Sequence, residues 1–306
     1  MREFSLDAWV LWDFRGSNPV LWDVLGVAAP GTTRRIVLVV PAEGEPALIT
    51  SVLDAHLVGG PVVRYNGRQE FEAELRARVR GRVAMEYSPG GALPIVSWAD
   101  AGAVEFVRSL GAEVVSSGDL FQAVAAAWDE DAEASHHEAV RHVMELHELG
   151  RARALGMTEA GLAELLLDDI TARKLLTEHE PGVSVGPNSG NPHHAATDAV
   201  IGPDQVLMLD IWARLPGPRT VFGDVTWMSF SGPEPPAEVR AVMRTVVAAR
   251  DAALALLDGT PRQGYELDRA ARGAIEAAGY GHGLMHRTGH SLGPGEHVHG
   301  LGANLD

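Results

Sequence analysis

The chain has 306 residues and no cysteine, which excludes disulfide bonds, thiolate catalysis and cysteine-ligated zinc and leaves histidines and carboxylates as metal ligands. Its 46% hydrophobic and 22% charged residues are typical of a soluble globular protein with room for two domains. The formal net charge of −16 argues against a nucleic-acid or anionic-membrane partner. No apolar run approaches the roughly 20 residues of a membrane span. The N-terminus lacks a signal-like pattern, which predicts a cytoplasmic protein.

The first third of the chain alternates β-rich runs with amphipathic helical patterns. Gly, Pro and Asn bound four predicted strands, at 34–40, 46–50, 62–65 and 82–87. Helices are predicted between them, at 68–80 and 96–111. This alternation predicts an α/β domain over residues 1–128.

From residue 129 the pattern becomes helical. A long helix is predicted over 131–155, inside a junction that covers 129–156, with a group of histidines on its solvent face: His136, His137, His142 and His147. A second helix is predicted at 158–178, and two more at 235–258 and 264–279. Six residues mark the expected buried stripe of the third helix: Val239, Val242, Val246, Ala249, Ala253 and Leu256. With two strand candidates at its centre, the segment 157–306 is predicted to form an α+β domain.

Two aspartates lie in those strand candidates, Asp210 in "VLMLDIWAR" (206–214) and Asp224 in "VFGDVTWMSF" (221–230). A carboxylate among large apolar residues costs several kcal/mol unless it is paired or binds a metal. A hairpin centred on Gly217 would make the two residues direct cross-strand neighbours, with Cβ atoms about 4.5–5.5 Å apart. One or two divalent cations would relieve their repulsion. The alternative is a bulge that displaces one aspartate to cap a turn.

The segment "GHGLMHRTGHSLGPGEHVHG" (281–300) holds five of the thirteen histidines. Its glycines weaken a helix by about 1 kcal/mol each, so a loop or strand is the better interpretation. A polar tail that scavenges metal is the alternative. A further histidine, His193, lies in the loop segment "NPHHAATD", 17 residues before Asp210.

The chain resembles the aminopeptidase P, prolidase and creatinase family of pita-bread hydrolases. Four segments carry the resemblance and follow one another in the family's order: "GPNSGNPHH", "MLDIWAR", "GDVTWMSF" and "HRTGHSLGPGEHVHG". The resemblance implies an α/β creatinase-like N-terminal domain, then an α+β pita-bread catalytic domain that is incomplete at its C-terminus. Three residues match the family's metal ligands: Asp210, Asp224 and His290. His193 matches the histidine that contacts the substrate, and His297 matches one that takes part in proton transfer. His286 fits a further active-site histidine, whereas His282 and His299 have no implied role.

The resemblance implies two divalent cations (Mn, Co or Zn) that activate a bridging water, and a short peptide substrate with an Xaa-Pro bond, cleaved by an aminopeptidase or a dipeptidase. A homodimer is a further expectation. The motifs "DIWAR" and "DVTW" depart from the peptidase pattern, which leaves the substrate open. The two glutamate ligands of the family would follow the end of this sequence, so we expect a truncated hydrolase or a chain without metal function. Residues 1–306 alone should then bind metal weakly. The alternatives are a creatinase-type C–N hydrolase without metal and a non-catalytic peptide-binding module on the same fold.

Overall fold

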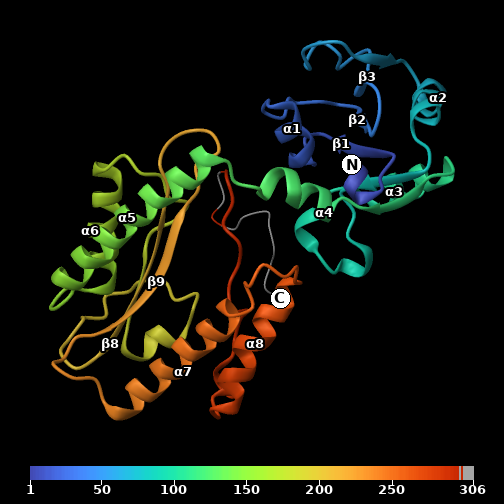
Figure 1. Ribbon diagram of the computed structural model, residues 1–306. Coiled ribbons are helices and arrows are strands. Elements are labelled where there is room, and N and C mark those ends of the chain that lie inside the picture. The colour runs from blue at the N-terminus through green and yellow to red at the C-terminus, as the bar shows by residue number, and fades with distance from the viewer. Residues whose placement is uncertain (296–297, 299–306) are drawn as a thin grey trace. The chain divides into compact units, whose positions relative to one another are not determined.

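The computed structural model describes residues 1–295 and residue 298 (Figure 1). The chain forms two compact units, the first covering Met1–Val124 and the second beginning at Ala125. Within the described residues, no helix is long and apolar enough to cross a membrane.

The first unit is a six-stranded mixed sheet with helices, in the strand order β4-β3-β2-β1-β5-β6. Its strands are β1 (Ala8–Phe14), β2 (Arg35–Pro41), β3 (Ala47–Ser51), β4 (Val63–Tyr65), β5 (Arg82–Met85) and β6 (Glu113–Ser116). Its α-helices are α1 (Pro19–Leu25), α2 (Arg68–Arg78), α3 (Ala101–Ser109) and α4 (Gly118–Phe121). β1 pairs antiparallel with β2 and parallel with β5. The four strands and two helices predicted from the sequence are present, while the prediction omitted β1 and β6.

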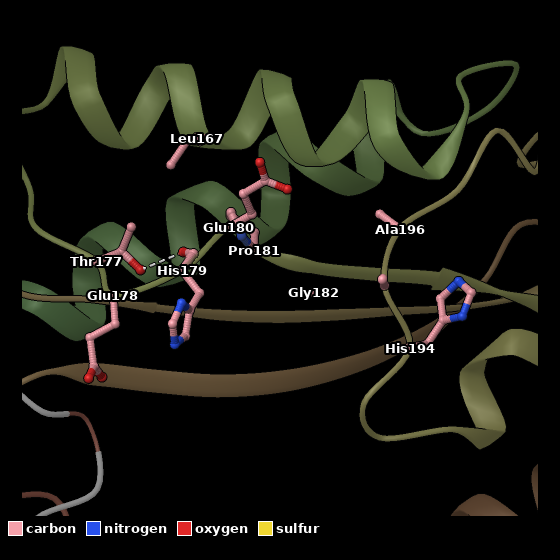
Figure 2. Close-up of a pocket in the computed structure, with 10 residues that line it drawn as sticks. Leu167, Thr177, Glu178, His179, Glu180, Pro181, Gly182, His194 and Ala196 are labelled. Atoms are coloured by element: carbon pink, nitrogen blue, oxygen red, sulfur yellow. Dashed lines mark hydrogen bonds between the residues drawn. The ribbon is translucent and has the colours of Figure 1, made fainter.

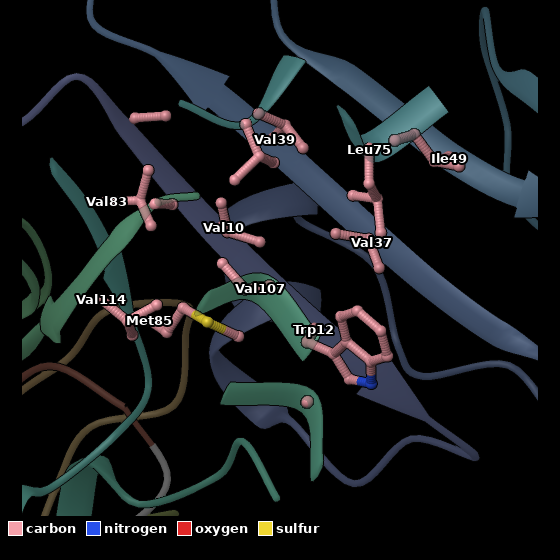
Figure 3. Close-up of a cluster of buried hydrophobic side chains, with 14 of the residues drawn as sticks. Val10, Trp12, Val37, Val39, Ile49, Leu75, Val83, Met85, Val107 and Val114 are labelled. Carbon is pink, nitrogen blue, oxygen red and sulfur yellow. The ribbon is translucent and has the colours of Figure 1, made fainter. Parts of the chain in front are cut away.

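The helix α3 begins later than its pattern predicts. The carboxylate of Asp100 accepts a hydrogen bond from the Ala103 backbone N–H, so Asp100 caps the helix and the preceding residues stay outside it. Branched apolar side chains from the central strands meet α2 and α3 in one core (Figure 3). Trp12 packs edge-on against Phe71 there, with ring centroids 5.4 Å apart.

A buried polar network runs beside this core. The carboxylate of Glu86 is fully buried and accepts hydrogen bonds from Trp9 Nε1 at 2.6 Å and Asn18 Nδ2 at 2.8 Å. Burial raises the pKa of Glu86 to about 7, although those hydrogen bonds act in the opposite direction. A proton on Glu86 therefore stabilises the folded first unit.

The second unit contains a three-stranded antiparallel sheet ordered β7-β8-β9, with two helices packed against it and two further helices packed against each other (Figure 1). The strands are β7 (Gly182–Val185), β8 (Val206–Ala213) and β9 (Gly223–Phe230). The helices are α5 (Glu130–Arg153), α6 (Glu159–Ala172), α7 (Ala237–Leu254) and α8 (Gly264–Ala277). Side chains of Asp129 and Thr158 cap α5 and α6 by accepting backbone N–H groups of their first turns.

The strand β8 has two different faces. Its residues alternate between partly exposed and buried, and the buried set joins the core that α5 and α6 form: Leu207, Leu209, Ile211 and Ala213. The other face carries Met208, Asp210 and Trp212, which are each partly exposed. The side chain of Asp210 therefore lies on the face opposite the hydrophobic core.

Two sequence predictions about helix faces are wrong. The stripe predicted for α7 is buried at Ala249 and Ala253, where α8 packs, but Val242 and Val246 are 42% and 48% exposed. Among the described residues α8 covers only the C-terminal half of that stripe. In α5, His147 does not face solvent: it is 1% exposed, and its Nε2 lies 2.9 Å from the Val225 carbonyl oxygen. Four-residue spacing alone could not show that this imidazole turns toward the sheet.

Candidate metal centre

Asp210 and Asp224 lie on adjacent antiparallel strands, but in a different register from the predicted one. Asp210 pairs with Thr226, and Asp224 pairs with Trp212. The hairpin is therefore centred on Pro218, one residue beyond Gly217, and direct pairing of the two aspartates is wrong. A one-residue shift of the centre offsets the partners by two residues, which keeps both side chains on the same face. Such diagonal neighbours lie about 7–8 Å apart.

The turn geometry accounts for the shifted centre. Arg219 adopts a positive φ of 58° and Gly217 one of 135°. The guanidinium of Arg214, which is mostly buried, donates to Thr220 Oγ1 at 2.9 Å and spans the loop. These contacts fix an asymmetric connection, and the Pro-Gly-Pro sequence did not specify it.

The carboxylates and His290 influence one another. Burial raises the pKa of Asp210, and the negative charge of Asp224 adds to this, while a 2.7 Å hydrogen bond from Thr226 Oγ1 opposes it. His290 Nε2 lies 3.3 Å from Asp224 Oδ2, and this contact raises the pKa of the imidazole. The charge of Asp224 therefore affects the pKa of both Asp210 and His290.

Helix α5 fixes the part of β9 that carries Asp224. His136 Nδ1 lies 2.7 Å from the Phe222 carbonyl oxygen, and His147 bonds the carbonyl of Val225, so the helix holds the strand on both sides of Asp224. Between them, Gly223 approaches α5 so closely that a Cβ would lie 2.7 Å from the Val140 backbone nitrogen. The strand can take this position because residue 223 has no side chain.

Helix α8 fixes the segment that carries His290. Asp268 is 8% exposed and accepts hydrogen bonds from the backbone N–H and the hydroxyl of Thr288, both at 2.7 Å. Arg272 bonds the same carboxylate and donates to the His286 carbonyl at 2.8 Å. Burial alone would raise the pKa of Asp268, but these hydrogen bonds hold it below its ordinary value. The sequence prediction did not identify Asp268, which lies on the buried side of α8 with Leu267 and Ala271.

The structure distinguishes His193 from its neighbour His194. The imidazole of His193 is exposed, and the structure gives it no hydrogen bond or ion pair to Asp210 or Asp224 among the described residues. His194 Nε2 instead lies 2.8 Å from the buried carboxylate of Glu159. The sequence prediction identified His193 and missed the oriented imidazole of His194.

The remaining predicted histidines lie in the C-terminal segment. His286 is exposed, and its Nδ1 lies 2.6 Å from the adjacent Arg287 carbonyl oxygen, which is a local contact that does not reach the aspartates. His297 and His299 lie outside the described residues. The role of His297 in proton transfer therefore stays a prediction.

The donor atoms fit a divalent cation in type. His290 Nδ1 lies 2.9 Å from the Ser291 carbonyl oxygen, to which it donates, so a neutral ring presents an unprotonated Nε2 to Asp224. Two acceptors face each other there, and a proton or a cation must lie between them. In the part of the chain that the structure describes, no group of three His, Asp or Glu side chains is close enough to hold a metal ion. The two carboxylates and the imidazole are therefore suitable ligand types for a divalent cation, but their described positions do not form a three-ligand site.

An open pocket of about 610 Å³ borders the sheet at β7 (Figure 2). It is lined by residues 177–182, residues 194–196 and Leu167. Gly182 pairs with Asp210, and a Cβ at Gly182 would lie 3.1 Å from the Cβ of that aspartate. His179, whose ring lies 6.4 Å from that of Trp212, and His194 also line the pocket. The pocket is therefore bordered by β7, whose residue Gly182 pairs with Asp210 on β8.

Two of the relatives to which the chain is similar in sequence are named as dipeptidases. The chain is 34% identical over 115 residues to a Bacillus subtilis protein named as a dipeptidase, YkvY, and 26% identical over 141 residues to an Xaa-Pro dipeptidase of Lactobacillus delbrueckii subsp. lactis. These matches cover 38% and 45% of this chain, and 30% and 37% of the relatives, so the chain matches about a third of their length.

Solved structures resemble the chain over nearly its whole length. Dipeptidase PepE from Mycobacterium ulcerans superposes with a TM-score of 0.69 and 21% identity, covering 99% of this chain and 80% of that one. X-Pro aminopeptidase from Thermotoga maritima gives a TM-score of 0.59 and 20% identity over 98% of this chain and 84% of that one. These likenesses confirm the fold, an α/β unit followed by a pita-bread unit.

The model of metallopeptidase family M24 matches residues 130–304, more than half of the chain. The match includes all the aspartates and histidines of the candidate metal centre. The chain belongs to metallopeptidase family M24.

Proposed function

We propose that the protein hydrolyses short peptides with the help of divalent cations, with Xaa-Pro bonds as the preferred substrates. Asp210, Asp224 and His290 are the proposed metal ligands. The observation that carries the proposal is the pair of carboxylates on one sheet face, with an imidazole nitrogen 3.3 Å from one of them. Membership of a metallopeptidase family and the similarity to proteins named as dipeptidases support it.

Each part of the chain has a distinct task in this proposal. Bound cations would lower the pKa of a coordinated water and polarise the scissile carbonyl. Asp210 and Asp224 would hold the positive charge on the partly exposed face of β8 and β9, and His290 would supply a nitrogen ligand. His193, by its match to the family, contacts the substrate near the scissile bond. His297 is proposed to assist proton transfer to the leaving amine, and His286 is proposed as a further active-site histidine.

A creatinase-type reaction without metal is less well supported. It gives no reason for two carboxylates to share a partly buried face, where burial and mutual repulsion raise the pKa of Asp210. A non-catalytic peptide-binding module would retain the pocket beside β7 and lack turnover.

The test is hydrolysis of Xaa-Pro dipeptides with Mn²⁺, Co²⁺ or Zn²⁺, in wild type and in Asp224→Asn. Removing this ligand should lower kcat/KM by about 100-fold or more, because loss of even an outer partner of a metal ligand costs about 10–100-fold. Asp251→Asn is the matched control, since Asp251 lies exposed on α7 beside Arg250. Turnover without metal, or full activity in Asp224→Asn, would support the creatinase-type reaction, and peptide binding without turnover would support the binding module.

A further inference from the structure

Glu159 is a buried carboxylate that the proposed mechanism does not use. It is the first residue of α6 and is 0% exposed. A buried carboxylate is costly unless hydrogen bonds satisfy it. Its partners lie 26 to 38 residues further along the chain, so it connects α6 to a distant segment.

The hydrogen bonds that Glu159 accepts fix both ends of the segment 186–197. At the first end, Oε1 accepts from the Val185 backbone N–H at 2.8 Å and from Asn188 Nδ2 at 2.9 Å. At the second end, Oε2 accepts from the Thr197 backbone N–H at 3.0 Å and from its hydroxyl at 2.7 Å. His194 Nε2 is a further partner of Oε2 at 2.8 Å. Each oxygen of the carboxylate therefore accepts at least two hydrogen bonds, which satisfies its acceptor capacity.

The charge of Glu159 contributes to the strength of these contacts. Burial alone would raise the pKa of Glu159, but the hydrogen bonds, foremost that of His194, lower it to about 2. Hydrogen bonds to an ionised acceptor are shorter and stronger than neutral ones. A neutral isostere at position 159 would replace one acceptor by a donor and leave several N–H groups without a partner.

The segment between these fixed ends carries His193. Its own side chain is exposed, and its backbone N–H donates to Asn191 Oδ1 at 3.0 Å, within the segment. This contact is local and does not tie His193 to the rest of the unit, whereas the adjacent His194 is held by Glu159. The position of His193 therefore depends on the carboxylate at the start of α6.

We propose that Glu159 is a positioning residue: its buried carboxylate, through His194 and Thr197, sets the conformation of segment 186–197 and so the place of His193 during peptide hydrolysis. The role of His193 in this statement rests on the proposed function. In this proposal Glu159 acts through the residues that it holds, and its hydrogen-bond partners do not include the proposed metal ligands.

The experiment compares wild type with Glu159→Gln, Glu159→Asp and Glu164→Gln. Glu164 is the matched control, because it lies exposed on the same helix and undergoes the same chemical change. Hydrogen exchange followed by mass spectrometry measures peptides that cover 183–199 and, as an internal reference, peptides of α5. The kinetic arm measures kcat and KM for an Xaa-Pro dipeptide with Mn²⁺.

In Glu159→Gln we expect exchange in 183–199 to accelerate about tenfold or more, as expected for the loss of charged hydrogen bonds, with α5 at the wild-type rate. We expect kcat to fall about tenfold or more with a smaller change in KM, since misplacing a positioned group by about 1 Å costs up to about 100-fold. Glu159→Asp keeps the charge and should recover part of both effects, and Glu164→Gln should behave as wild type.

Wild-type exchange in Glu159→Gln would overturn the proposal, and so would faster exchange with unchanged kcat. If Glu159→Gln does not fold, Thr197→Val removes one donor and must show the same two effects at smaller size, or the proposal fails. A wild-type protein that cleaves no peptide contradicts the proposed function and the kinetic part together. The exchange arm still decides in that case whether Glu159 fixes the segment.

Discussion

Replacing Gly223 by alanine should move Asp224, because Gly223 lies where β9 approaches α5 most closely. A Cβ at this position would lie 2.7 Å from Val140 N, 2.8 Å from Ala139 C and 2.9 Å from Val140 Cα. All three atoms belong to the helix backbone and cannot turn aside as a flexible side chain can. The strand must therefore move away from the helix, and Asp224 moves with it.

The cost of Gly223→Ala is expected to be steric. Gly223 is not among the glycines with positive φ, so alanine meets no backbone penalty at this position. Insertion of a methyl group into a packed interior costs about 1–3 kcal/mol, and we expect the second unit to lose that much stability in urea unfolding. A shift of one ligand by several tenths of an ångström should also weaken Mn²⁺ binding about tenfold or more in calorimetric titration.

Gly273→Ala is the control for this prediction. Gly273 lies in α8, and a Cβ at this position would meet nothing within 4 Å, so alanine should stabilise the helix by up to about 1 kcal/mol. If Gly223→Ala unfolds at the wild-type urea concentration and binds Mn²⁺ as wild type does, the close approach of β9 to α5 does not position Asp224.

Three further changes test the scaffold. Burial raises the pKa of Glu86 to about 7 from an ordinary 4.5, so the unfolded chain loses this proton at a lower pH than the folded one. The stability of the first unit should therefore fall by about 3 kcal/mol as pH rises from about 4.5 to about 7. Glu86→Gln should remove that slope in urea unfolding, and an unchanged slope would assign it to other groups. Asp268→Asn should weaken Zn²⁺ binding about tenfold by loosening Thr288, and an unaltered Kd would contradict this. His147→Leu leaves the Val225 carbonyl without its imidazole partner and should cost about 1–3 kcal/mol, so a stability equal to wild type would refute that role.

The sequence predicts the helices of the second unit from their apolar spacing, and it predicts β8 and β9 from their runs of large apolar residues. It does not show which face of β8 carries Asp210, because residues on both sides of the aspartate are apolar and the alternation of buried and partly exposed side chains appears only in the structure. The register could not be predicted to the residue, because it depends on positive φ at Arg219 and on the contacts of Arg214 within the turn.

The supporting residues of the candidate site are harder to predict, because their partners are distant in sequence. Glu159 appears in the sequence as an ordinary acidic residue in the first turn of a helix, and its partners lie up to 38 residues away. The spacing of His147 along α5 predicts a position that faces solvent. Its imidazole instead hydrogen-bonds the carbonyl of Val225, 78 residues further along the chain. A hydrophobic pattern records which side of a helix is apolar, and it does not record where a single polar atom finds its partner.

The central claim, that Asp210, Asp224 and His290 bind a catalytic cation, is tested most directly by anomalous diffraction at the zinc edge from crystals grown with Zn²⁺. The account predicts a peak on the open face of β8 and β9, about 2.0–2.2 Å from a carboxylate oxygen of Asp224 and about 2.0–2.1 Å from His290 Nε2. A peak at the histidines of α5 instead, or none near Asp224 at saturating zinc, would contradict it.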